Sequence, residues 1–201
     1  MSFMAVEKAC MARFFYIQNN DSKSGKWGKV MFQTGDTILY GTHGVCTIQS
    51  IQEMNLSGKM QEYYILNPVY NKASTIYVPI HNEKLTAKMN RILSAEEIYE
   101  LIRSMPDEKT IWIENESARK ERFQEIISGN NRKEMVQLIK TLYLHQEKQK
   151  EKGKKLHIAD ERFLREAEKL LYNEFALVLK MEPNQVLPFI MGQIEPEKKF
   201  E

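Results

Sequence analysis

The chain has 201 residues, of which 42% are hydrophobic and 28% are charged, and its formal net charge is +2. This length allows one large domain or two small ones, and the hydrophobic fraction argues against a wholly disordered chain. No apolar run approaches the roughly 20 residues of a membrane span. Cys10 and Cys46 form no disulfide framework, and neither they nor the four histidines have the spacing of a metal site. We therefore expect a cytoplasmic protein without a metal or cofactor.

The first thirty residues differ in composition from the rest of the chain. The apolar run FFYI at 14–17 is too short for a signal-peptide core, and 19–28 is rich in Asn, Ser, Gly and Lys. This pattern predicts that 1–30 is a disordered or weakly attached leader. An alternative is that translation starts at Met31, which leaves open whether 1–30 belongs to the native protein.

Residues 31–88 have the pattern of a small β domain. Short runs of β-branched and aromatic residues alternate with Gly, Asn and Pro, and the runs cover 37–40, 45–51, 62–66 and 75–79. Gly58 marks a hairpin turn between the second and third runs, and Pro79 ends the last run because proline cannot donate to a ladder. Four or five short strands within about 60 residues predict a small curled sheet or barrel.

This β domain contains no catalytic constellation. His43 lies beside turn glycines with no acid or nucleophile paired to it, and Cys46 falls in a strand as a small core residue. The glycines at 35, 41 and 44 lack the Gly-Lys-Ser/Thr helix start of a phosphate loop. We predict that the chain is not an enzyme. Small barrels usually bind another macromolecule along an edge strand or loop, and a purely structural domain is the alternative.

From residue 92 to about 191 the apolar period changes to 3.6, which predicts an all-α bundle. Ser94 and Glu97 have the spacing of a capping box, and the helix that they begin runs to Met105, before Pro106. The pattern predicts further helices over about 115–128, from 131 into the polar run 146–153, over 158–181 and over 183–190, the last interrupted by Pro188.

Charge is unevenly distributed in this helical half. Between residues 119 and 155 there are eleven basic and five acidic residues, a local net charge of +6. A patch of this kind suits the phosphates of a nucleic acid, whereas alternating Lys and Glu are also ordinary on a solvated helix. Trp112 lies in a loop before the second helix. It either stacks on bases beside these cations or packs in the core with Ile111 and Ile113.

Several segments together resemble the CarD/CdnL family of bacterial transcription regulators, whose wider family includes a module of transcription-repair coupling factors. The residues that carry the resemblance are MFQTGDTILY at 31–40, HGV at 43–45, EYYIL at 62–66, IYVP at 76–79, Ser128-Gly129, and the Leu164, Ala167, Leu170 and Leu171 spacing of the last long helix. The resemblance covers about 31–190 and is most specific in the β domain. The chain lacks the helicase body and any Walker motif of the coupling factors.

The resemblance implies an α+β multidomain fold, in which a small Tudor-like β-barrel at 31–88 is followed by an all-α helical bundle at 92–191. It implies that the β domain binds the RNA polymerase β subunit. The helical domain then binds promoter DNA near the upstream edge of the bubble and stabilises the open complex. We expect a nucleoid-associated monomer without membrane contact. Whether it activates or represses, and at which promoters, stays open, and the alternative function is a protein–protein interaction adaptor without direct DNA contact.

The resemblance also implies the residues that contact polymerase. Arginines with this role in relatives fall at Met54 and Tyr77 here. We therefore expect a more apolar contact by β-edge pairing, with Tyr64, Ile76 and Val78 as further members.

The implied DNA contacts lie on the helices. Lys120, Lys140 and Arg165 match basic DNA-facing positions of the family, and we add four neighbouring cations: Arg119, Arg122, Lys133 and Arg162. The minor-groove tryptophan of many relatives aligns near Asn115. Trp112 therefore either takes that role through a shifted loop or belongs to the core.

Overall fold

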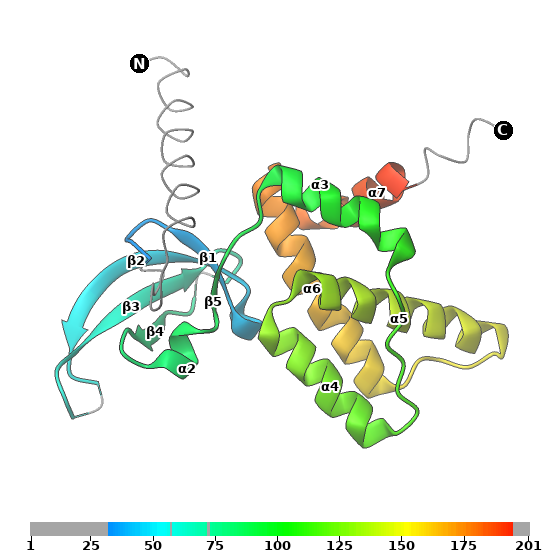
Figure 1. Cartoon of the computed structure of the whole chain (residues 1–201), viewed down its shortest axis with the longest axis horizontal. Helices are drawn as coiled ribbons and strands as arrows, with labels where there is room; N and C mark the ends of the chain where they lie inside the picture. Colours follow the sequence, from blue (N-terminus) through cyan, green and yellow to red (C-terminus); the bar gives the residue numbers. More distant parts are fainter. Residues whose placement is uncertain (1–31, 57, 72, 195–201) are drawn as a thin grey trace, which may run out of the picture. The chain divides into compact units, whose positions relative to one another are not determined.

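A computed structural model describes residues 32–56, 58–71 and 73–194, and they form an antiparallel sheet followed by a helical region (Figure 1). This confirms the predicted small β domain and helical bundle. The predicted leader at 1–30 lies outside the described residues, as does Cys10. Among the described helices, none is long and apolar enough to cross a membrane.

The sheet has five strands in the order β4-β3-β2-β1-β5, and every neighbouring pair is antiparallel. The elements are β1 (Thr37–Tyr40), the 3-10 turn η1 (Gly41–His43), β2 (Val45–Met54), β3 (Gln61–Pro68), β4 (Ile76–Pro79), the short helix α2 (Glu83–Thr86) and β5 (Met89–Arg91). A bulge between Ile48 and Ser50 interrupts the β2–β3 register. Within the described residues the ladder ends at β4 and β5 and is therefore an open, curled sheet.

The four strands expected from the sequence are present, whereas α2 and β5 were not predicted. β5 pairs with β1 through Ile38 and Arg91, so the sheet extends past the predicted limit at residue 88. Three residues of mixed polarity give no periodic signal, and tertiary pairing alone defines this strand. Cys46 is fully buried in β2 as expected, and burial raises the pKa of its thiol to about 11.

The helical region contains five longer helices and one 3-10 turn. These are α3 (Ala95–Ser104), η2 (Met105–Asp107), α4 (Glu116–Gly129), α5 (Arg132–Glu151), α6 (Ile158–Leu179) and α7 (Pro183–Ile194). Ser94 and Glu97 form the predicted capping box of α3. The side chains of Asn115 and Asn131 accept hydrogen bonds from the first turns of α4 and α5, which sets where each helix begins.

Two helices continue through segments where the helical signal of the sequence is weak, and only α7 passes its predicted limit at residue 190. α5 continues through the polar run to Glu151, since Lys, Glu and Gln are good helix formers even without an apolar face. α7 continues through Pro188 to Ile194. Val186 and Ile190 are buried on either side of the proline, so packing retains a helix that has lost one backbone hydrogen bond.

The helical core takes buried side chains from each of the helices α3, α4, α5, α6 and α7. Phe123 of α4 meets Phe163 of α6 edge to face with ring centroids 5.8 Å apart, and Phe175 lies fully buried further along α6. Leu138 and Leu142 of α5 close the same cluster. The apolar residues at helical spacing therefore face inward, and the outer faces of these helices are left for other contacts.

A buried ion pair connects the helices to the end of the sheet. The Glu174 side chain is 1% exposed and accepts hydrogen bonds from Arg132 Nε at 3.0 Å, from Arg132 Nη2 at 2.8 Å and from Leu93 N at 2.9 Å. Arg132 Nη2 also donates to the carbonyl of Arg91, the last residue of β5. One guanidinium therefore ties α5, α6 and the strand-to-helix connection together.

A second junction involves the turn η1 of the β domain. Asn130 ends α4 in the left-handed conformation, and its amide, in the orientation that satisfies both polar atoms, exchanges two hydrogen bonds with the main chain of Gly41. Gly44 has a φ of +74°, and a Cβ there would lie 3.3 Å from Leu170 of α6. Both the conformation and the close approach favour glycine at this position.

We expect Glu174→Gln to lower the free energy of unfolding by about 3 kcal/mol, because it leaves a buried arginine without its counter-charge. Pairing it with Arg132→Met should recover part of that loss, since the unpaired charge is then removed. Urea unfolding of the three proteins measures both effects. If Glu174→Gln were as stable as the parent protein, Glu174 would not be a buried ion-pair partner of Arg132 in solution.

Candidate nucleic-acid interface

One exposed face of α6 carries a row of cations. Arg162, Arg165 and Lys169 are exposed and recur at intervals of three and four residues, so they share one side of the helix. Ile158 lies one turn before Arg162 and belongs to the same side. The inward side of α6 holds Phe163 and the rest of the core, so packing fixes the direction in which the cations project.

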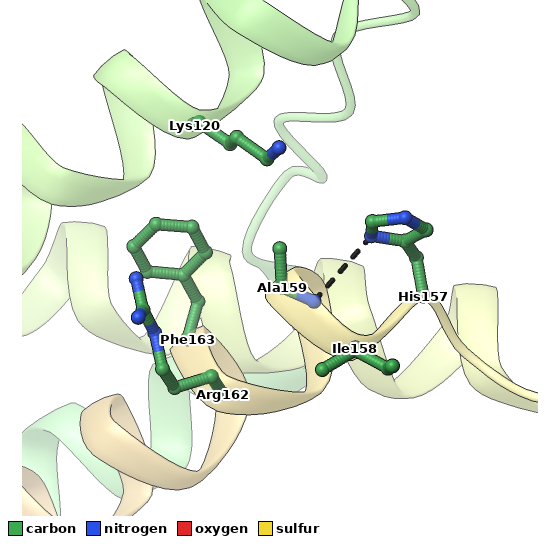
Figure 2. A pocket seen from close by; sticks show the side chains of 6 residues that line it. All are labelled: Lys120, His157, Ile158, Ala159, Arg162 and Phe163. Atoms are coloured by element: carbon green, nitrogen blue, oxygen red, sulfur yellow. Dashed lines mark hydrogen bonds between the residues drawn. The ribbon is translucent and has the colours of Figure 1, made fainter.

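A hollow of about 400 Å³ lies where this face meets α4. Figure 2 shows Lys120 of α4 on one side of the hollow and Phe163, Ala159 and His157 across from it, with Arg162 and Ile158 further round α6. The Arg162 guanidinium lies 5.6 Å from the centroid of the Phe163 ring, an aromatic face that steadies it. The His157 side chain accepts a hydrogen bond from Ala159 N at 3.4 Å and caps the helix.

A second hollow of about 370 Å³ continues along α6 toward the β domain. Its α6 side is lined by Arg162, Arg165 and Lys169, and its other side by Thr42 and His43 of the η1 turn. Arg162 therefore belongs to both hollows, and the two form one basic strip.

Carboxylates accompany some of these cations. Lys120 pairs with Glu116 at 2.6 Å, and Arg165 pairs with Glu161 on the same helix. The hydrogen bond from Lys120 lowers the pKa of Glu116, and the charges of His157 and Arg119 act in the same direction. The surroundings of this carboxylate are thus positive overall.

Arg119 occupies a structural position instead of a surface one. Its side chain is 8% exposed, and it pairs with Asp160, whose side chain is 3% exposed, through Nη2 and Oδ2 at 3.2 Å. Its Nε donates to the other carboxylate oxygen, and its Nη1 donates to the carbonyls of Ile113 and Glu114. The guanidinium is committed within the protein, so we leave Arg119 out of the proposed contacts.

Trp112 is partly buried and packs against the helical core. Its ring stacks on His145 with centroids 3.7 Å apart, and the Arg119 guanidinium covers it at 4.3 Å. Burial lowers the pKa of His145, and the charge of Arg119 lowers it further while that of Asp160 opposes this. Of the two roles left open by the sequence, the observed packing favours the core.

The remaining predicted cations lie on α4 and α5 and face carboxylates or carbonyls. Lys140 Nζ donates to the carbonyls of Met105 and Glu108 and so holds the η2 turn. Lys133 pairs with Glu108 at 3.2 Å, and Arg122 pairs with Glu125 and Glu134. Arg122 and Lys133 stay partly exposed, whereas Lys140 acts mainly as a link within the fold.

At the other end of the described chain, β4 is an edge strand whose only strand neighbour among the described elements is β3. Ile80 N donates to Glu62 O, and Val78 lies opposite Tyr64. Because backbone groups in an antiparallel strand alternate in direction, this register places the N–H and C=O of Tyr77 on the outer edge. The Tyr77 side chain is 44% exposed.

The other predicted polymerase contacts differ in position. Tyr64 and Val78 are buried in the core of the β domain, so their side chains support β4 from behind. Ile76 is half-buried on β4 itself. Met54 lies at the hairpin end of β2 and is separated from β4 by β3.

The fold and these surfaces can now be compared with known families. The family model of the CarD-like/TRCF RID domain matches residues 32–93. The β domain belongs to this family. The match covers every strand from β1 to β5, and it agrees with the resemblance to CarD/CdnL-type proteins. The RID domain is an RNA polymerase-interacting domain, so the match supports a transcription-associated protein with RNA polymerase as a partner.

The match ends where the helical region begins, so the DNA-contact residues stay predictions. The structure brings Lys120, Arg162 and Arg165 to one strip next to the RID domain. It adds Lys169 and Ile158, which sequence reasoning missed, although the helical spacing from 158 to 169 was a usable signal. Within the described ranges no three His, Cys, Asp or Glu side chains come together as a candidate metal site.

We expect Trp112→Ala to lower the free energy of unfolding by about 2 kcal/mol, because it opens a cavity beside the core and uncovers Arg119. DNA affinity, measured where both proteins are folded, should change by less than about twofold. Unfolding titrations and fluorescence anisotropy with a labelled duplex give the two values, and Trp112→Phe is the milder control. An unchanged stability with a large loss of DNA affinity would instead make Trp112 a DNA contact.

Proposed function

We propose that the chain is a non-enzymatic bacterial transcription regulator that links RNA polymerase to promoter DNA. The observation that carries the proposal is a RID domain followed by a helix with an exposed basic face. The RID domain contacts the β subunit of polymerase, and the strip on α6 contacts the phosphates of the promoter. The protein acts as a monomer at the nucleoid.

The polymerase contact proceeds through the edge of β4. Tyr77 offers an outward N–H and C=O, and a strand of the β subunit can extend the sheet there. Main-chain pairing supplies affinity, and the exposed Tyr77 ring supplies a side-chain contact next to it. Tyr64 and Val78 contribute by keeping the strand in place from the core.

The DNA contact lies near the upstream edge of the transcription bubble. Open and closed complexes present differently shaped DNA, and a regulator shifts the balance only by the difference between its affinities for the two. When the RID domain is bound to polymerase, the α6 strip is held close to the neighbouring DNA. Its effective concentration at that DNA is therefore high. Tighter binding to the distorted DNA stabilises the open complex.

The second candidate is an interaction adaptor without DNA contact. The observation that favours it is the pairing of helical cations with carboxylates in Arg119–Asp160, Arg122–Glu134, Lys133–Glu108 and Arg132–Glu174. In these pairs, carboxylates neutralise four of the basic residues counted in the 119–155 window. The α6 strip retains Arg162 and Lys169 as exposed cations, and the two candidates therefore differ in what this strip binds.

Tyr77→Pro should strongly reduce retention of core RNA polymerase on the immobilised full chain, because it removes the outward N–H of an edge strand that tolerates proline. Tyr77→Ala is the matched control, since it alters the side chain alone. We expect it to retain polymerase better than the proline variant. Equal retention by the parent and the proline variant, with both folded by circular dichroism, would exclude pairing at this edge.

Arg162→Gln combined with Lys169→Gln should reduce the slope of log affinity for duplex DNA against log salt by about two units, since each phosphate contact contributes about 0.9. The matched control is Arg103→Gln with Lys109→Gln, which removes one Arg and one Lys that are exposed on and after α3. It should leave the slope almost unchanged.

The same titration separates the two candidate functions. A parent chain without a steep salt dependence would be an adaptor. Equal losses in the two double variants would show that net charge, and not the α6 strip, determines binding.

A further inference from the structure

The hollow between the η1 turn and α6 has walls from both domains. Its volume is about 370 Å³, which lies within the range of small-ligand sites. A Cβ on Gly44 of the turn would lie 3.3 Å from Leu170 of α6, so the two walls are in close contact. The RID domain and the helical region therefore build one concave site together.

Cations dominate the α6 wall of this hollow. Arg162, Arg165 and Lys169 recur every three or four residues, which places neighbouring Cβ atoms about 5–6 Å apart on one side of the helix. Arg165 shares its charge with Glu161. Within the described residues, Arg162 and Lys169 have no carboxylate partner. A row of this length suits the several charges of a di- or triphosphate.

One carboxylate lies among these cations. Glu166 lines the same hollow and makes no hydrogen bond or ion pair within the described part of the chain. A carboxylate repels phosphate but accepts hydrogen bonds from hydroxyl and amino groups. The backbone of DNA offers no such donor, whereas a ribonucleotide carries donors on its ribose and its base. The mixed lining therefore favours a ribonucleotide over a DNA strand.

The η1 wall supplies an aromatic ring. The His43 ring stacks on the ring of Tyr40, with centroids 5.8 Å apart and an interplanar angle of 10°. Tyr40 is buried and supports the exposed His43 from behind. A supported flat ring beside cations suits stacking on a nucleobase of any type. Thr42 adds a hydroxyl and Asn173 adds an amide to the same hollow.

We infer that this hollow binds a ribonucleoside di- or triphosphate, with its phosphates on the α6 cations, its donors at Glu166 and its base against His43. The site itself does not depend on the proposed function, whereas its consequence rests on it. Because Arg162 and Lys169 also belong to the proposed DNA contact, the nucleotide and promoter DNA compete for them. A rising nucleotide concentration then lowers the affinity of the chain for DNA.

The direct test is isothermal titration calorimetry of the full chain with ADP. Pyrophosphate is the matched ligand that lacks ribose and base, and magnesium ions are left out so that the phosphates keep their charge. We expect a dissociation constant of about 100 μM for ADP and binding about fivefold weaker for pyrophosphate. No binding of ADP, or equal binding of the two ligands, overturns the inference.

Variants locate the site. Lys169→Gln should weaken ADP binding about fivefold, and Lys109→Gln, at an exposed lysine outside the hollow, should not. His43→Ala should also weaken ADP binding about fivefold and change DNA affinity by less than about twofold, with the exposed His81→Ala as its control. Glu166→Ala should reduce the preference for ADP over pyrophosphate, since it removes an acceptor and a negative charge.

Two outcomes of this series overturn the inference. In the first, Lys169→Gln and Lys109→Gln bind ADP equally well, so the hollow does not hold the phosphates. In the second, His43→Ala loses ADP and DNA affinity to the same extent, so the hollow is a DNA contact instead.

Fluorescence anisotropy with a labelled duplex tests the consequence. ADP should displace the parent chain from DNA at concentrations near its own dissociation constant, and displacement no greater than that by pyrophosphate at equal ionic strength would refute the competition. A chain that binds ADP but no DNA would overturn the proposed function and leave the nucleotide site intact. A chain that binds DNA but no ADP would do the reverse, so the two failures are distinguishable.

Discussion

The ion pair between Arg119 and Asp160 is the interaction on which the candidate interface depends. It joins α4 to the first turn of α6. The same guanidinium covers the Trp112 ring and donates a hydrogen bond to the loop before α4, so its position is fixed on several sides. Lys120 follows Arg119 directly, and Ile158 lies two residues before Asp160. The pair therefore sets how the two sides of the hollow face each other. Removing one partner would leave a buried charge and disturb both.

The distribution of charge shows why a sum over the sequence is a poor guide to a binding surface. The +6 window at 119–155 includes Arg119 and Arg132, which are both committed to buried carboxylates. The exposed strip instead lies mainly on α6, outside that window. What distinguishes the strip is the combination of exposure, helical spacing and an adjoining RID domain, and of these three the exposure is not visible in the sequence.

Much of the architecture could be predicted because local signals decide it. The capping box at Ser94, the asparagines before α4 and α5, and the turn at Gly58 each act within a few residues of the chain. β5 could not be predicted, since three residues become a strand only by pairing with β1. The same limit applies to the site: that Arg119 is buried while Arg162 is exposed depends on Asp160, 41 residues away from Arg119 along the chain.

The central claim is that β4 and α6 bind different partners, polymerase and promoter DNA. Site-specific photo-crosslinking in a polymerase–promoter complex tests it most directly, with p-benzoylphenylalanine placed in the full chain at position 77, 158 or 143. Tyr143 is exposed on α5 and lines neither of the two hollows. We expect the probe at 77 to crosslink to the β subunit, the probe at 158 to DNA, and the probe at 143 to neither. A probe at 158 that reaches only protein would contradict the account.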